Sequence, residues 1–346
     1  MLATRRWTPT FVGVGALSLT AVALVSAAPR GAPAAPAQDV QALLAAAHAK
    51  HRGVTDGANA DYIPALAKVD SKLFGIALVT VDGQVFEVGD IEARFSIQSI
   101  SKVFTLARVL QDLGEDAVID NMGVDATGQV FNSIEAIEQY KGHEMNAFVN
   151  PGAIAATSMV RGEDAEDVLA RVVAIHSAFA GRELDFDVPV MESELATNQR
   201  NQAIAMLMHA YGRIEADPLQ ACEIYTKQCA LSVNARDLAV MGATLANGGK
   251  NPLTGEQVVD PRHVKGILAV MATAGLYDDS GKWLFATGLP AKSGVGGGIV
   301  AVSPGKFGIA AFSPPLDAAG NSVRAQLAIR EISDALGGNP YDVAPR

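Results

Sequence analysis

The sequence predicts an α/β fold of the α+β type, in which an antiparallel sheet is flanked by terminal helices and accompanied by an all-helical lobe. Three observations favour it. Strand-like runs occur near both ends of the chain, a hairpin signal joins the first two, and the middle, roughly 120–272, has helical periodicity almost throughout. Because the strand-like runs are remote from one another, we expect one sheet assembled from both ends of the chain. A cleft is expected at the seam between the sheet and the helical lobe.

The first elements can be assigned from periodicity. Asp39 precedes an apolar-periodic stretch over about 40–51 and is predicted to cap a helix there. Alternating runs follow at 74–80 and 84–88, and the Asp82-Gly83 pair between them is a strong hairpin signal. The sequence therefore predicts a helix followed by two antiparallel strands.

Helices dominate the next part of the chain. From Ser99 the apolar period becomes helical, and Gly114 is the predicted end of that helix. In the middle, Asp217-Pro218 and Asp260-Pro261 are each typical of an N-cap followed by proline at the first helical position.

The last third of the chain returns to strands. The runs 296–302 and 307–312, separated by Ser303-Pro304-Gly305, predict two more strands, and a final helix is expected over about 322–336. We therefore expect a sheet lobe at about 39–115 and 273–346, and a helical lobe at about 116–272.

The first 28 residues are predicted to be a signal peptide. Arg5 and Arg6 form a basic n-region, an uncharged apolar run extends over 11–28, and residues 25–27 resemble a cleavage site. Residues 29–38, rich in proline and alanine, are predicted to be a disordered linker before the domain at 39–346. We expect an exported protein, periplasmic or secreted, with no stable membrane anchor after processing. An uncleaved anchor is the alternative.

Charge and cysteine content narrow the function classes. The net charge of −10 argues against a nucleic-acid partner, because no basic stripe is present to neutralise phosphates. Cys222 and Cys229 are the only two cysteines. On one helix they would lie about 10 Å apart along the axis, too far for a disulfide. We expect both to be free and buried.

A candidate catalytic motif lies at Ser99-Ile100-Ser101-Lys102. Residues i and i+3 share a helix face, so the lysine amine can reach the serine hydroxyl and take its proton. Lysine does this only if burial lowers its pKa from about 10.4 towards 7. The helix N-terminus would also direct an N–H at a developing oxyanion. A surface helix that begins with a capping serine has the same pattern.

A second motif strengthens this interpretation. Lys292-Ser293-Gly294 resembles the Lys-Thr-Gly of penicillin-recognising enzymes, which also carry Ser-x-x-Lys. The predicted sheet and helical lobe resemble the arrangement of that β-lactamase and DD-peptidase superfamily.

The chain resembles the bacterial-type glutaminases more closely, over roughly 55–336. Seven stretches carry the resemblance in the order and spacing typical of that family. They are Ala60-Asp61-Tyr62-Ile63-Pro64, 95–104, Asn146-Ala147-Phe148-Val149-Asn150, Ser193-Glu194 with Arg200-Asn201-Gln202-Ala203, Tyr225 with Gln228-Cys229, Gly275-Leu276-Tyr277-Asp278 and 291–298.

The resemblance implies a set of catalytic residues. Ser99 would attack the amide carbon of L-glutamine with Lys102 as base, giving a glutamyl-enzyme and ammonia. The N–H groups of Ser99 and Val295 would form the oxyanion hole. Tyr62 and Tyr277 would relay a proton or orient Lys102.

The resemblance also implies a set of substrate-binding residues. Glu194 would bind the substrate ammonium, and Asn150, Asn201 and Tyr225 would donate to its α-carboxylate. Glu194 and Asn201 are seven residues apart, and on one helix they would face the same way. Ser99, Tyr277 and Val295 would contact the substrate as well.

Further expectations concern partners and one position at which the sequence departs from the family pattern. The family resemblance implies a homodimer or homotetramer with no cofactor and no metal. Pro151 stands where the family usually has alanine, and would either shift the Asn150 side chain or stiffen its loop. His48 and His51 have a metal-ligand spacing, but no third ligand is evident nearby.

Two alternative functions remain open. A β-lactamase-like, penicillin-recognising hydrolase shares both lysine motifs, although the sequence contains no Ser-Asp-Asn. A glutamine-binding module that has lost catalysis would keep the same pocket.

Overall fold

The computed structural model describes residues 37–143 and 145–345, so the predicted signal peptide and nearly all of the predicted linker lie outside the described residues. A five-stranded antiparallel sheet has the order β2-β1-β7-β6-β5. Its strands come from both ends of the described chain, as predicted: β1 (Gly75–Thr80), β2 (Val85–Gly89), β5 (Ala291–Ser293), β6 (Gly298–Ser303) and β7 (Phe307–Phe312).

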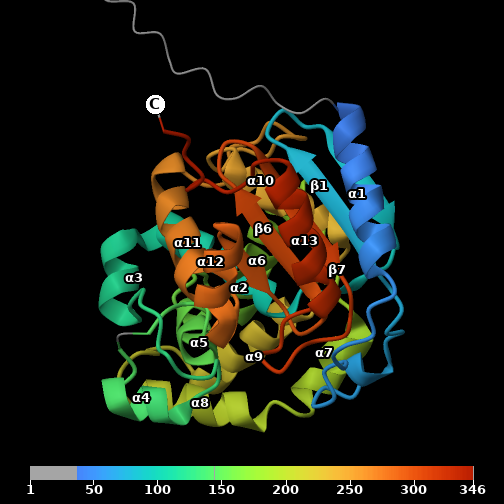
Figure 1. The fold of residues 1–346 in the computed structure, drawn as a ribbon. Coiled ribbons are helices and arrows are strands. Elements are labelled where there is room, and N and C mark those ends of the chain that lie inside the picture. The colour runs from blue at the N-terminus through green and yellow to red at the C-terminus, as the bar shows by residue number, and fades with distance from the viewer. Residues whose placement is uncertain (1–36, 144, 346) are drawn as a thin grey trace, which may run out of the picture. The chain divides into compact units, whose positions relative to one another are not determined.

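Two helices from opposite ends of the described chain, α1 (Ala37–His51) and α13 (Val323–Ala335), lie side by side across one face of the sheet (Figure 1). Alternate strand residues such as Ile76, Ile309 and Ala311 point to this face and form an apolar cluster with the two helices. Helix α1 already includes Ala37, the first described residue, so Asp39 lies within the helix and not before it as predicted.

The opposite face of the sheet packs against α10 (Ala235–Ala246). Ala77, Val300 and Ala310 point to this side and join a second apolar cluster. A Cβ on Gly308 would lie 2.1 Å from the backbone nitrogen of Ala243, so only glycine allows α10 to pack this closely on β7. This contact attaches the central helical region to the sheet.

The middle of the chain is helical, as predicted, apart from one short strand. Asp217 and Asp260 cap their helices through side-chain oxygens, as their Asp-Pro pairs predicted. Strand β4 (Ser232–Val233) pairs with β3 (Phe95–Ser96) and was not predicted, because two residues are too short to show a period. The remaining helices are α2 (Ser101–Leu113), α3 (Glu115–Asn121), α4 (Ile134–Tyr140), α5 (Asn150–Ser158), α6 (Ala165–Ala180), α7 (Val188–Leu195), α8 (Gln199–Ala210), α9 (Pro218–Cys229), α11 (Pro261–Ala274) and α12 (Ser280–Thr287), with 3-10 turns η1 (Leu66–Lys68), η2 (Gln98–Ile100) and η3 (Tyr277–Asp279).

The observed architecture confirms the predicted fold class. None of the helices within the described ranges is long and apolar enough to cross a membrane. Cys222 and Cys229 are free and buried, as expected.

Candidate active site

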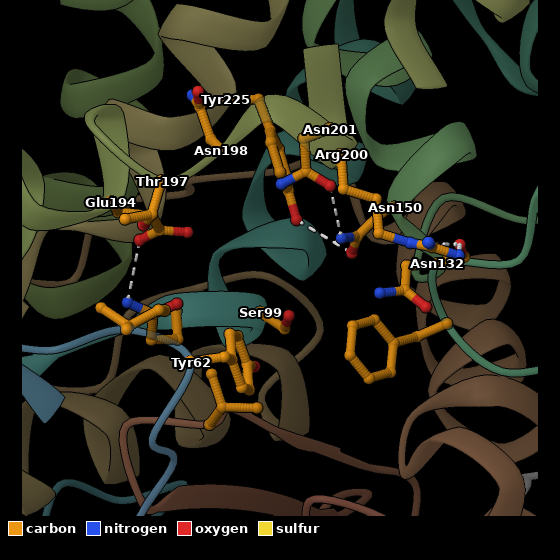
Figure 2. Close-up of a pocket in the computed structure, with 14 residues that line it drawn as sticks. Tyr62, Ser99, Asn132, Asn150, Glu194, Thr197, Asn198, Arg200, Asn201 and Tyr225 are labelled. Carbon is orange, nitrogen blue, oxygen red and sulfur yellow. Dashed lines mark hydrogen bonds between the residues drawn. The ribbon is translucent and has the colours of Figure 1, made fainter. Parts of the chain in front are cut away.

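A pocket of about 120 Å³ brings together residues from segments that are far apart in the sequence (Figure 2). Most of the predicted site residues line it: Tyr62, Ser99, Asn150, Glu194, Asn201, Tyr225 and Val295. Its other lining residues are Ile63, Gln98, Phe131, Asn132, Thr197, Asn198 and Arg200. Lys102 and Tyr277 lie behind this lining and contact it, as described below.

Ser99 lies where the β3 strand turns into helix α2. It is in the 3-10 turn η2, and the α-helix itself begins at Ser101, two residues later than predicted. The residue before it, Gln98, has φ = 51°, a left-handed conformation that costs a residue with a Cβ about 1–2 kcal/mol. Ser99 is 8% exposed and lines the pocket. The tight turn therefore presents its hydroxyl to a ligand.

Lys102 is buried, with 1% of its surface exposed. Its amine donates to the carbonyl oxygen of Phe148 (3.0 Å) and to Asn150 Oδ1 (2.7 Å). Burial lowers the pKa of Lys102 to about 7. A neutral amine has two N–H groups, which match these two acceptors, and a lone pair that can accept a proton.

Asn150 connects the lysine to the far wall of the pocket. Its Oδ1 also accepts a hydrogen bond from the Tyr225 hydroxyl (3.1 Å), and its Nδ2 donates to Asn201 Oδ1 (2.9 Å). Pro151 lies in the first turn of α5, where its missing N–H leaves no helical hydrogen bond unmade. The proline therefore stiffens the start of this helix.

Glu194 forms another wall of the pocket. It is 8% exposed, and burial raises its pKa to about 7, while a 3.2 Å hydrogen bond from Gln98 Nε2 acts in the opposite direction. Glu194 lies in the last turn of α7 whereas Asn201 lies in α8, so the two do not share a helix face as their spacing suggested. The break between the helices still brings both to the pocket.

Tyr277 lies beside Ser99. Burial raises its pKa to about 12, although hydrogen bonding to Ser99 and Ser293 acts to lower it. The phenol is therefore protonated at neutral pH. The amine of Lys292 lies 4.2 Å from the centre of the Tyr277 ring and donates to the Ser293 carbonyl oxygen (2.8 Å). Lys292, which belongs to the second lysine motif, thus packs against the Tyr277 ring.

Val295 lies in the glycine-rich turn between β5 and β6. Within the described part of the chain no acceptor is found for its backbone N–H, which leaves this donor for a ligand. A Cβ on Gly296 would lie 2.6 Å from the carbonyl oxygen of Ser96, so glycine allows the turn to approach the Ser99 segment. The run predicted as a strand from residue 296 begins at Gly298 for this reason.

Among the lining residues to which sequence reasoning assigned no role are Gln98, Asn132 and Arg200. Gln98 positions Glu194, and its left-handed φ has no sequence signal because glutamine rarely adopts it. Arg200 donates to the carbonyl oxygen of Asn132 (3.0 Å) and brings a positive charge to the pocket. The position of Arg200 next to Asn201 in the motif was the sequence signal that could have identified it as a site residue.

Tyr62 differs from the other site residues in being 56% exposed. Its ring lies beside Ser99 at the edge of the pocket (Figure 2). The histidines weighed as metal ligands have other partners: His48 contacts the Phe74 carbonyl oxygen and His51 contacts Glu331. No group of three or more potential metal ligands occurs among the residues described.

The family model for glutaminase matches residues 57–341. The chain belongs to the glutaminase family. It is 51% identical to a glutaminase of Mycobacterium ulcerans over 290 residues, which cover 84% of this chain and 91% of that protein. Both the family and the enzyme class predicted from the motifs are therefore confirmed.

Solved structures agree with the family assignment. A structure described as "Probable glutaminase ybaS" has a TM-score of 0.88 and 45% identity, covering 89% of this chain and all of that one. The structure of Mglu in its glutamate form has a TM-score of 0.83 and 38% identity, covering 88% of this chain and 70% of that one. The relationship thus extends through nearly the whole described part of the glutaminase.

Proposed function

We propose that this glutaminase hydrolyses L-glutamine to L-glutamate and ammonia through a glutamyl ester on Ser99. One observation carries the proposal: a buried lysine amine, with a pKa of about 7 and two fixed acceptors, lies one turn from a pocket-facing serine. Such an amine is neutral often enough at neutral pH to accept the serine proton.

The pocket has complementary groups for the two ends of an amino acid. The Glu194 carboxylate pairs with the α-ammonium, and that charge would favour ionisation of Glu194 despite its burial. Asn201, Tyr225 and Asn150 gather around the place left for the α-carboxylate, with Arg200 adding a positive charge nearby. The amide side chain then extends towards Ser99.

The reaction proceeds in two halves. Ser99 Oγ attacks the amide carbon as Lys102 takes its proton, and the N–H groups of Ser99 and Val295 hold the oxyanion. The proton passes to the leaving nitrogen, with the Tyr277 phenol beside Ser99 as the relay. Ammonia departs, and water repeats the sequence on the ester to release glutamate and restore the serine.

Ammonia release from glutamine by the purified mature protein tests this proposal, with asparagine as the shorter competitor. Turnover of glutamine that Ser99→Ala abolishes, without loss of glutamine binding, supports it. Tight binding of glutamine without turnover would favour a silent binding module. Hydrolysis of a chromogenic cephalosporin without glutamine turnover would favour the β-lactamase-like alternative.

We also propose that the protein is exported, cleaved after about residue 28, and forms a homodimer or homotetramer. The basic n-region and the apolar run of the leader support export and cleavage. The family resemblance supports the oligomeric state. N-terminal sequencing of the protein from the producing cell, and light scattering on the purified protein, test the two separately.

A further inference from the structure

Lys292 is a fully buried lysine to which the proposed mechanism gives no step. It lies on β5, none of its surface is exposed, and its Cα partner on β6 is the apolar Val300. Lysine is almost never fully buried without a partner, because its side chain loses both hydration and conformational entropy there. The burial of this amine therefore calls for a specific contact.

The Lys292 amine contacts both the backbone of β5 and Tyr277. It donates to the Ser293 carbonyl oxygen (2.8 Å), and it lies over the face of the Tyr277 ring, 4.2 Å from the ring centre. Burial lowers the pKa of Lys292 well below its ordinary value, and a positive charge on Lys102 acts in the same direction. The amine is therefore neutral at neutral pH, and it makes both contacts without adding a positive charge beside Lys102.

The Ser293 carbonyl oxygen also lies near the Tyr277 hydroxyl. The hydroxyl is 3.5 Å from that oxygen, beyond the usual O–H···O hydrogen-bond range of about 2.5–3.0 Å. The much shorter bond from Lys292 makes the amine the main donor to this carbonyl. The single proton of the phenol is thus left for its other neighbour, Ser99.

The backbone fixes Tyr277 beside the strand. Its φ of 53° is a left-handed conformation, which is unfavourable for a residue with a Cβ. A Cβ on Gly275 would lie 1.7 Å from the carbonyl oxygen of Ala291, so this segment packs directly on β5. The Ser293 N–H also donates to the Gly275 carbonyl oxygen (3.3 Å). Removing the Lys292 amine should therefore change the acceptor of the phenol more than the position of the ring.

We propose that Lys292 is a positioning residue for the Tyr277 phenol. By occupying the carbonyl oxygen of the next residue, its amine leaves the phenol proton directed towards Ser99. The inference rests on the proposed role of Tyr277 as the proton relay. In that relay the phenol gives its proton to the leaving nitrogen and receives the one that Lys102 took from Ser99, so it is restored as ammonia departs. A phenol turned to the Ser293 carbonyl would be out of line for both transfers.

Lys292→Met keeps a buried chain of similar length and removes the amine, so the Tyr277 hydroxyl should turn to the Ser293 carbonyl. We expect kcat for glutamine to fall by about tenfold or more. KM should stay within about twofold, because the residues that would hold the α-ammonium and α-carboxylate are unchanged. Val300→Ala, which loosens the packing of the strand partner and keeps the amine, is the matched control. It should lose stability in urea and keep kcat within about twofold.

A double-mutant cycle with Tyr277→Phe separates positioning from a merely structural effect. Because the amine acts through the phenol, Lys292→Met should lower kcat by less than about twofold in the Tyr277→Phe background. An equal loss in both backgrounds, or an unchanged kcat in Lys292→Met alone, would overturn the inference and leave the proposed function intact. Full kcat in Tyr277→Phe alone would overturn the relay and the inference with it. Lys292→Leu takes the place of Lys292→Met should that variant not fold.

Discussion

Lys102 donates a 2.7 Å hydrogen bond to the side-chain oxygen of Asn150, and that oxygen also accepts from Tyr225. The amide therefore links the Lys102 amine, the proposed base, to residues that would bind the substrate carboxylate. Because it is neutral, it holds the amine without stabilising the charged ammonium as a carboxylate would. The predictions below depend on this relationship.

Asn150→Asp should raise the pKa of Lys102 and suppress activity at neutral pH. A carboxylate at this distance favours the ammonium form and raises a lysine pKa by roughly 1–3 units. The acid limb of the kcat profile should move up by that amount, with activity partly regained at higher pH. Asn201→Asp is the matched control, because Asn201 contacts Asn150 rather than Lys102. Equal profiles for the two variants would contradict the assignment.

The activity should fall as the pH drops through about 7. Burial lowers the pKa of Lys102 to about 7 and raises that of Glu194 to about 7. The reaction needs neutral Lys102 and ionised Glu194, and both forms prevail only above their pKa values. Because the two groups interact, the limb reports the pair as a whole. A kcat/KM that stays constant from about pH 8 to about pH 5 would be inconsistent with this mechanism.

Glu194→Gln should separate binding from chemistry. The amide cannot pair with the substrate ammonium, so KM should rise by about tenfold or more. The acid limb of kcat should persist, since Lys102 still titrates. Steady-state kinetics across pH provides both readouts. An unchanged KM in this variant would show that Glu194 does not bind the substrate.

Tyr277→Phe should lower kcat by about 10², because it removes the hydroxyl beside Ser99 and keeps the ring above Lys292. Tyr62→Phe should cost less, since Tyr62 lies exposed at the edge of the pocket. Stopped-flow measurement of the first turnover compares the two directly. A larger loss in Tyr62→Phe would transfer the relay role to that residue.

Gln98→Ala and Gln98→Gly should differ in stability and agree in function. Glycine relieves the left-handed φ of 51°, so Gln98→Gly should be about 1 kcal/mol more stable than Gln98→Ala by urea unfolding. Both variants lose the hydrogen bond to Glu194, and both should raise KM. An unchanged KM in both would show that Gln98 does not position the carboxylate.

Much of the fold was readable from the sequence because its signals are local. The hairpin at 82–83, the Asp-Pro helix starts at 217 and 260 and the final helix all depend on neighbouring residues. Strand pairs of two residues have no such signal. The turn at 294–297 could not be predicted from periodicity either, because its glycines are required by a close contact with a segment that is remote in the sequence.

The sequence predicted a set of site residues, but not the hydrogen bonds between them. The sequence motifs identified Ser99, Lys102, Asn150 and Tyr225 as site residues. Nothing in the order of these motifs indicates that the side-chain oxygen of Asn150 accepts from both Lys102 and Tyr225. That contact joins α2, α5 and α9, and depends on how the three helices pack. Tertiary contacts of this kind appear only in the folded chain.

The most direct test of the central claim is acid quenching during glutamine turnover, followed by mass spectrometry of peptides. The account predicts a glutamyl adduct on Ser99 in the unmodified enzyme, and none in Ser99→Ala, which should also lose ammonia release. Lys102→Met, which keeps a buried chain of similar length without the amine, should form the adduct at least about 10²-fold more slowly. Full ammonia release by Ser99→Ala, or an adduct on another residue, would contradict the mechanism.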